Sequence, residues 1–291
     1  MQIEPIETIS KDDPGTDPAA PRLSDKIKAL CKAIGGNEEG FAVLHKSIIE
    51  LETLVLSEPP NPEAGDSALR EITGEERGYL NDAYCRWETE IEHEYAQAVL
   101  SGKETDISNY LLCDRFGGLI RRELALVAAP APRRVLFIGS GPLPISAIYL
   151  ALFTGGLIDC LDRDMEAVEV SRQVIKKLGF GETIRVFNGT GESFDVKDYD
   201  LIVIALLAKP KRRILRNLRK RAGADCRLLC RTSFGLRTLI YDPTPDDALQ
   251  GFRIAAKQIA DCDQTISTLL LESTARNAQR VVLRWVDEID S

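Results

Sequence analysis

The second half of the chain alternates short apolar runs with amphipathic segments, and this alternation limits the folds that it can adopt. Apolar runs at residues 134–138, 158–162, 183–187, 200–208 and 226–233 predict buried strands, and residues 143–156, 165–180 and 209–222 predict helices. Strands that alternate with helices form right-handed crossovers and a mainly parallel sheet with helices on both faces. The sequence therefore predicts an α/β fold with a Rossmann-like, doubly wound sheet over residues 130–291.

The end of the chain departs from this alternation. Residues 264–273 and 278–286 are predicted to form a closing antiparallel hairpin. Such a pair is typical of the seven-stranded sheet that binds S-adenosylmethionine (SAM), so the fold class itself suggests a ligand.

The first half of the chain has helical periodicity only. Residues 1–22 contain four prolines and many acidic residues, and are predicted to be a disordered arm. Apolar residues at three- and four-residue spacing predict helices at residues 23–34, 39–56, 75–102 and 107–129, with a long loop at residues 57–67. We therefore expect an all-helical domain over residues 23–129 before the sheet.

Composition excludes several classes of function. The net charge of −8 argues against nucleic-acid binding, and no apolar run approaches the ~18 residues of a membrane span, so a cytoplasmic location is expected. Seven scattered cysteines without a C-x-x-C pair and only two histidines argue against a disulfide framework and against a metal site. The one basic run, residues 209–221, is interpreted as a solvated helix face rather than an RNA-binding surface.

The turn after the first predicted strand carries the signal for a cofactor. Gly139 and Gly141 lie where the backbone of a doubly wound sheet approaches its ligand. The second strand ends with Asp162 and Asp164, just over twenty residues further on, where a carboxylate can accept hydrogen bonds from ribose hydroxyls. Together these features predict a nucleoside-binding site.

The prolines of the same turn distinguish between cofactors. A dinucleotide loop holds a pyrophosphate on backbone N–H groups at the start of a helix, but Pro142 and Pro144 each lack that donor. SAM has no phosphate, and proline is favourable at the start of a helix. The turn therefore favours SAM over NAD.

Several segments together resemble the nicotianamine synthase family. The segments are residues 90–100, 135–151, 161–175, 205–218 and 230–253, and they follow one another in the same order as in the family. The second of them contains the G-x-G-P-L-P turn and the helix after it. The resemblance implies that the chain transfers the 3-amino-3-carboxypropyl group of SAM, rather than its methyl group, to an amine and releases methylthioadenosine.

The acidic helix at residues 87–95 supplies the candidate base. By spacing, Glu88 and Glu92 share one face and Glu90 and Glu94 another, so the run also fits a solvated acidic helix. The resemblance places Glu92 at the family's catalytic glutamate, with Glu94 as the second choice. His93 is expected to point away from that face.

The chain departs from the family at one position that contacts the substrate. The family has a tyrosine near the reacting amine, and the matching residue here is Phe116. Tyr110 or Tyr241 could supply a hydroxyl instead. Arg115 is a candidate for pairing a substrate carboxylate, with an ion pair as the alternative. Phe116, Arg115 and Tyr241 are therefore the predicted substrate-binding residues.

The remaining predicted positions surround the cofactor. Arg231 and Arg237 could complete the pocket or form structural ion pairs. The predicted SAM-binding residues are Gly139, Ser140, Gly141, Pro142, Leu143, Asp162, Arg163, Thr190, Glu192, Ala205 and Leu206.

The leading prediction is a SAM-dependent aminocarboxypropyl transferase that condenses SAM-derived units into a metal-chelating amino acid. The alternative is a single transfer onto an amino acid such as histidine, which gives the precursor of an opine-type metallophore. A SAM-dependent methyltransferase or a SAM-binding scaffold without catalysis is less favoured. SAM and an amino acid acceptor are the expected small-molecule partners, no bound metal is expected, and a homodimer is left open.

Overall fold

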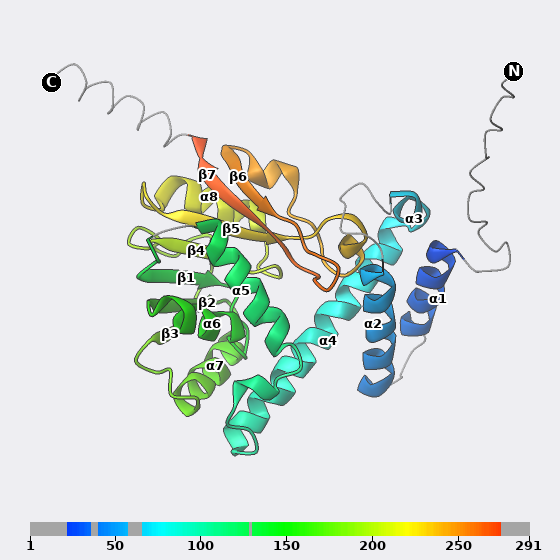
Figure 1. Ribbon diagram of the computed structural model, residues 1–291, viewed down its shortest axis with the longest axis horizontal. Helices are drawn as coiled ribbons and strands as arrows, with labels where there is room; N and C mark the ends of the chain where they lie inside the picture. The colour runs from blue at the N-terminus through cyan, green and yellow to red at the C-terminus, as the bar shows by residue number, and fades with distance from the viewer. Residues whose placement is uncertain (1–21, 36–39, 58–65, 128–129, 275–291) are drawn as a thin grey trace, which may run out of the picture.

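The computed structural model describes residues 22–35, 40–57, 66–127 and 130–274. The N-terminal part is helical, and Figure 1 shows its long helix α4 running between two shorter helices and the rest of the molecule. Arg22, the last residue of the predicted arm, hydrogen-bonds Glu71; the rest of that arm lies outside the described residues. The elements are α1 (Leu23–Gly35), α2 (Phe41–Leu56), α3 (Asp66–Glu71), α4 (Gly74–Ser101), the 3₁₀ turn η1 (Ile107–Asn109) and α5 (Cys113–Val127).

Local interactions fix both ends of α4. Thr73 and Glu76 form a reciprocal capping box at its start, and Gly102 ends it with a φ of 77°, which favours glycine. The prediction of one continuous helix at residues 107–129 is wrong. The Asp106 side chain accepts from Ser108 N–H and closes a short 3₁₀ turn, Tyr110 is extended, and a separate helix then begins at residue 113. Helix α3 was missed at the end of the predicted loop.

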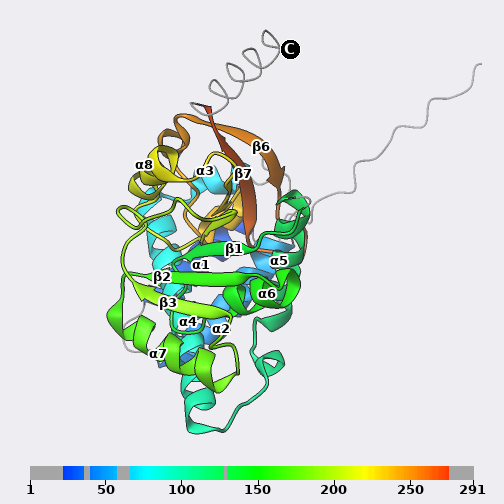
Figure 2. The same ribbon diagram turned by 90° about the vertical axis from the view of Figure 1, so that its left-hand side faces the viewer.

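The sheet has seven strands in the order β3-β2-β1-β4-β5-β7-β6. Strands β1 to β5 pair in parallel, whereas β7 lies antiparallel to both β5 and β6. Figure 2 shows the sheet with β3 at one edge and the β6–β7 pair at the other. The strands are β1 (Arg134–Ile138), β2 (Leu157–Asp162), β3 (Ile184–Asn188), β4 (Leu201–Ile204), β5 (Arg227–Thr232), β6 (Phe252–Gln258) and β7 (Ser267–Ser273). The prediction of a doubly wound α/β sheet is confirmed.

The closing hairpin is formed by other residues than predicted. Strand β7 occupies the predicted segment, but its partner is β6, which precedes it; the segment at residues 278–286 lies outside the described residues. Strand β6 forms the edge of the sheet, is nowhere fully buried, and has a register shift between Ile254 and Ala256. It therefore lacks both the apolar run and the regular alternation by which strands are recognised.

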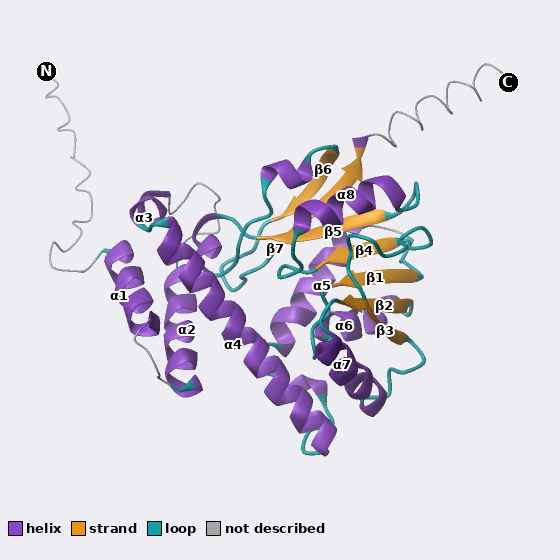
Figure 3. Cartoon of the chain, turned by 180° about the vertical axis from the view of Figure 1, so that it is seen from behind, coloured by secondary structure: helices purple, strands orange, loops and turns teal. Residues whose placement is uncertain are grey.

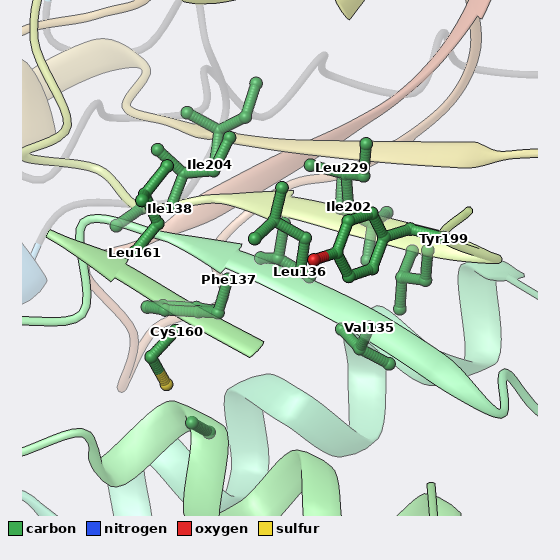
Figure 4. Packing of buried hydrophobic residues seen from close by; sticks show 14 of the residues in the cluster. Val135, Leu136, Phe137, Ile138, Cys160, Leu161, Tyr199, Ile202, Ile204 and Leu229 are labelled. Atoms are coloured by element: carbon green, nitrogen blue, oxygen red, sulfur yellow. The ribbon is translucent and has the colours of Figure 1, made fainter. Parts of the chain in front are cut away.

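Helices cover both faces of the sheet. Helices α5, α6 (Ile145–Thr154) and α7 (Met165–Lys177) lie on the face seen in Figure 1, and α8 (Lys211–Arg221) lies on the opposite face, seen in Figure 3. Side chains of the central strands, among them Val135, Phe137, Ile202 and Leu229, fill the core between these layers (Figure 4). This packing fixes the carboxyl ends of the parallel strands, where a doubly wound sheet binds its ligand.

A second apolar cluster joins the helical region to the sheet. Tyr84 and Trp87 of α4 are fully buried in it, together with Leu206 after β4 and Tyr241 after β5. Helix α4 also packs against α7 and against the turn η2 (Gly235–Leu239). The cluster therefore holds one face of α4 next to the loops at the ends of the strands.

The basic helix α8 is anchored on its apolar side. Ile214, Leu215 and Leu218 are buried, while Arg212 and Arg213 form ion pairs with Asp247 and Glu192. This arrangement fits the interpretation of a solvated helix face. Within the described ranges, every helix is too short or too polar to cross a membrane.

A buried ion pair ties α5 to the sheet. The Arg231 guanidinium of β5 donates to both carboxylate oxygens of Glu123, at 2.9 and 3.0 Å, and to Ser146 at 3.0 Å. Thr268 of β7 donates to the same carboxylate. The side chains of Arg231 and Glu123 are 2% and 0% exposed, so neither charge has water as an alternative partner.

We expect Glu123→Ala to lower the free energy of unfolding by about 3–5 kcal/mol, because it leaves the Arg231 charge buried and unpaired. Glu169→Ala is the matched control: it removes the carboxylate of an exposed Arg172–Glu169 pair, and about 1 kcal/mol or less is expected. Urea unfolding of both variants measures the difference. Equal losses would contradict a structural role for the buried pair.

Candidate active site

A cavity of about 250 Å³ opens where α4 faces the carboxyl ends of the parallel strands. Its size suits a small molecule rather than a macromolecule. The loops after β1, β2, β3, β4 and β5 contribute to its wall, and α4 contributes one side. Glu92, Phe116 and Tyr241 line it. So do all predicted SAM-binding residues, namely Gly139, Ser140, Gly141, Pro142, Leu143, Asp162, Arg163, Thr190, Glu192, Ala205 and Leu206.

The turn after β1 requires glycine for two separate reasons. Gly139 has a φ of 86°, and a Cβ there would lie 3.0 Å from the Cβ of Ala208 and 3.2 Å from that of Ala205. Gly141 has a φ of 64° and faces into the cavity. Helix α6 starts directly after Pro144, as predicted for a proline-containing helix start. The turn therefore brings bare backbone to the cavity wall.

Asp162, the last residue of β2, holds this turn in place. One carboxylate oxygen accepts the N–H of Gly141 at 2.8 Å, and the other accepts the N–H of Asp164 at 3.0 Å. Asp164 in turn caps α7 by accepting the N–H of Glu166. Each oxygen of Asp162 keeps a further lone pair that can accept a ribose hydroxyl.

The loops after β3 and β4 contribute further residues to the cavity wall. The Thr190 hydroxyl contacts Ser193, and Glu192 forms an ion pair of 3.4 Å with Arg213 at the rim. Ala205 and Leu206 are buried and follow β4 directly. Ala205 packs directly against the glycine turn, because a Cβ on Gly139 would lie 3.2 Å from the Cβ of Ala205.

Glu92 lies across the cavity from the sheet and reaches the glycine turn. A Cβ on Gly141 would lie 2.8 Å from Oε2 of Glu92, so the carboxylate occupies the space that the missing side chain leaves. Burial raises its pKa well above the usual value, and the negative charges of Glu88 and Asp162 raise it further. His93 also lines the cavity, contrary to expectation, and Glu94 is exposed.

A second carboxyl group of the cavity was not among the predicted site residues. Glu88 is 6% exposed and lines the cavity one helical turn before Glu92. The Tyr241 hydroxyl lies 3.0 Å from each of its oxygens and donates to this carboxylate. Burial raises the pKa of Glu88 to about 7, against the opposing effects of the Tyr241 hydrogen bond and the Arg115 charge. The four-residue spacing of Glu88 and Glu92 was the signal for it.

Arg115 and Phe116 lie in different environments. Arg115 does not line the cavity: its guanidinium donates to both oxygens of Glu52, at 2.7 and 3.0 Å, and to Tyr84. The structure therefore places Arg115 in an ion pair, which was the alternative to the predicted substrate contact. Both terminal nitrogens of its guanidinium donate to the Glu52 carboxylate. Phe116 lines the cavity with an apolar ring, and Tyr110 is buried nearby in the same apolar cluster.

The two arginines near β5 have structural partners. Arg231 lines the cavity, but its guanidinium is held by Glu123 and Ser146. Arg237 donates to the carbonyl groups of Asp261 and Gln264. In the described part of the chain, no group of three or more His, Cys, Asp and Glu side chains is arranged to hold a metal ion.

The geometry suits a reaction between a cofactor on the sheet and a group held against α4. The glycine turn and Asp162 can bind a nucleoside, and Glu92 can accept a proton next to that turn. The carboxyls of Glu88 and Glu92 make the same region attractive to cations.

Known proteins agree with this description. MtNAS, solved in a Glu-to-Gln mutant form in complex with S-adenosylmethionine, superposes with a TM-score of 0.78 at 25% identity over 88% of this chain and 99% of that chain. L-Histidine 2-aminobutanoyltransferase of Pseudomonas aeruginosa is 31% identical over 68% of this chain and 73% of its own length. Probable nicotianamine synthase 4 of Arabidopsis thaliana is 24% identical over 84% and 85%.

The fold, the cavity and these relatives define a SAM-dependent transferase. The sequence profile of the family described as nicotianamine synthase protein matches residues 65–278. The chain therefore belongs to the nicotianamine synthase family, as the motifs of the sequence predicted.

We expect Gly141→Ala to weaken SAM binding about tenfold or more, because the new Cβ meets the Glu92 carboxylate at 2.8 Å. Gly155→Ala is the matched control, since Gly155 has the same φ of 64° and open space around it. Both variants should lose about 1 kcal/mol of stability from the strained backbone. Calorimetric titration with SAM would contradict the assignment if both variants bound it equally well.

Proposed function

We propose that the chain transfers the 3-amino-3-carboxypropyl group of SAM to the amine of an amino acid, with Glu92 as the base, and releases methylthioadenosine. The observation that carries the proposal is the contact between the Glu92 carboxylate and Gly141 of the nucleoside turn. This contact supports the proposal because it brings a proton acceptor to the turn that we propose as the SAM-binding turn.

The cofactor sits on the sheet side of the cavity in this proposal. Asp162 accepts the ribose hydroxyls in this proposal, and Thr190 and Glu192, which also line the cavity, are the proposed contacts of the adenine. The backbone at Gly139 to Leu143 and the surface at Ala205 and Leu206 enclose the nucleoside and the methionine part. Arg163 closes the rim, where its guanidinium contacts the Lys209 carbonyl.

The transfer is a displacement at the γ-carbon of the sulfonium. Three carbons on the sulfur are electrophilic, so position decides which of them reacts. The acceptor enters as an ammonium ion, loses one proton to Glu92 and attacks the γ-carbon with the freed lone pair. The carbon–sulfur bond breaks, sulfur keeps the electron pair, and methylthioadenosine leaves as a neutral thioether.

L-Histidine is the acceptor that we propose first. Relatives named L-histidine 2-aminobutanoyltransferase match at 26–31% identity, and plant nicotianamine synthases aligned over 80% or more of their length match at 24–25%. Phe116 supports the same choice, because it gives the cavity an apolar ring where the family resemblance expects a tyrosine hydroxyl. A single transfer would then give the precursor of an opine-type metallophore.

A second candidate is condensation of several SAM-derived units, as the name nicotianamine synthase implies. The 0.78 TM-score to MtNAS over nearly all of that chain favours it. In this case the amine of a second SAM-derived unit replaces histidine as the acceptor. A cytoplasmic location, a homodimer and a division into domains at residues 23–129 and 130–291 stay predictions.

The products distinguish these reactions. Incubation with SAM and L-histidine should give methylthioadenosine and a histidine adduct, seen by mass spectrometry. Methylthioadenosine without added amino acid would favour condensation of SAM-derived units instead. S-Adenosylhomocysteine as the nucleoside product would show methyl transfer and contradict the proposal.

We expect Glu92→Gln to retain SAM binding but to lower kcat by at least about 10²-fold, because the amide cannot accept the ammonium proton. Glu94→Gln is the control, since Glu94 is exposed on the same helix. Calorimetry measures binding and release of methylthioadenosine measures turnover. Full turnover by the Glu92 variant would refute the base assignment.

A further inference from the structure

Two carboxyl groups share the wall of the cavity, and the proposed reaction uses only one of them. Glu88 and Glu92 lie four residues apart on α4, which places them on one face of the helix. Both line the cavity, and neither forms an ion pair of 4.0 Å or less within the described residues. Two carboxylates in one enclosed space repel each other, and a proton shared between them removes the repulsion.

We infer that Glu88 and Glu92 share one proton in the empty cavity, and that entry of the SAM sulfonium expels this proton and leaves Glu92 ready to accept another. The inference rests on the proposed function, since it gives Glu92 its role as base. It assigns Glu88 a part in the reaction cycle.

Tyr241 can hold Glu88 in place in both charge states. A tyrosine hydroxyl is both donor and acceptor, so it can donate to an ionised Glu88 and accept from a protonated one. Its oxygen lies 3.0 Å from both carboxylate oxygens, and its ring packs at 4.9 Å from the ring of Tyr84. Glu88 can therefore gain or lose a proton without moving.

The surrounding groups favour one retained proton. Burial raises the pKa of both carboxyls, Glu92 is raised further by Glu88, and Arg115 and Arg231 act in the opposite sense on Glu88 alone. Tyr241 contacts Glu88 directly. The other groups that interact electrostatically with Glu88 are Tyr84 and Cys85 of α4, Glu52 of α2, Arg115 of α5 and Arg231 of β5; those that interact with Glu92 are Glu88, Asp162 at the end of β2, and Tyr110 before α5.

The protons of the reaction balance if Glu88 and Glu92 together release one proton and take up one proton in each turnover. SAM enters with one positive charge, and the shared proton leaves to solvent. Glu92 then takes one proton from the acceptor ammonium, and the amine displaces methylthioadenosine to give a secondary ammonium. When the products leave, the pair again holds one proton. The single proton of each turnover is therefore released when SAM binds and not when the carbon–nitrogen bond forms.

Calorimetric titration of the full chain with SAM, without acceptor, tests this at pH 6.5 in buffers of different ionisation enthalpy. We expect release of about one proton per SAM bound. S-Adenosylhomocysteine is the matched probe, because it lacks the sulfonium charge, and it should release less than about half as much. Equal release by the two ligands in the wild-type protein would overturn the inference, whatever the variants do.

Two variants locate the proton. Glu88→Gln removes one charge of the pair, so Glu92 ionises more readily; proton release at pH 6.5 should fall below about half, and the acidic limb of kcat/KM should move to lower pH. Glu90→Gln, an exposed acid on the same helix, should change neither. Unchanged proton release in Glu88→Gln would overturn the shared proton.

The failure of this inference differs from the failure of the proposed function. Turnover to methylthioadenosine without a difference in proton release between SAM and S-adenosylhomocysteine would overturn the shared proton alone. Proton release without methylthioadenosine would support the shared proton and overturn the reaction.

Discussion

The contact between α4 and the glycine turn is the constraint on which the site depends. Gly141 has a φ of 64°, which favours glycine, the Glu92 carboxylate lies in the space beside it, and its N–H is held by Asp162 from the next strand. Three segments far apart in the chain thus meet at one residue. In the proposed reaction, the sheet binds the nucleoside part of SAM and the helix supplies the base.

Much of the fold and part of the site could be predicted from the sequence. The central strands are continuous apolar runs, which periodicity detects without any tertiary information. The glycine turn and Asp162 lie at the spacing expected for a ribose contact, and all eleven predicted cofactor residues line the cavity. These features are local in sequence, which is why they are visible there.

The remainder depends on contacts between distant residues. Arg115 is held by Glu52, 63 residues earlier, and Tyr241 reaches Glu88 across 153 residues. No spacing rule predicts such pairs, so the sequence could neither decide between a substrate contact and an ion pair for Arg115 nor show that Tyr241 reaches Glu88. Edge strand β6 was missed for a different reason, because a half-exposed strand with a bulge has neither apolar continuity nor regular alternation.

Helix α4 is continuous over 28 residues, from a capping box to a left-handed glycine. Tyr84, Trp87, Glu88 and Glu92 are therefore carried by a single rigid rod, with the aromatic residues buried against neighbours and the carboxyls at the cavity. A shift at one point of a continuous helix moves the rest of it, so the packing of the buried face of α4 determines the positions of both carboxyl groups together. Substitutions of the buried residues Tyr84 and Trp87 would therefore lower the rate of the reaction by displacing Glu88 and Glu92, although neither aromatic residue contacts a substrate.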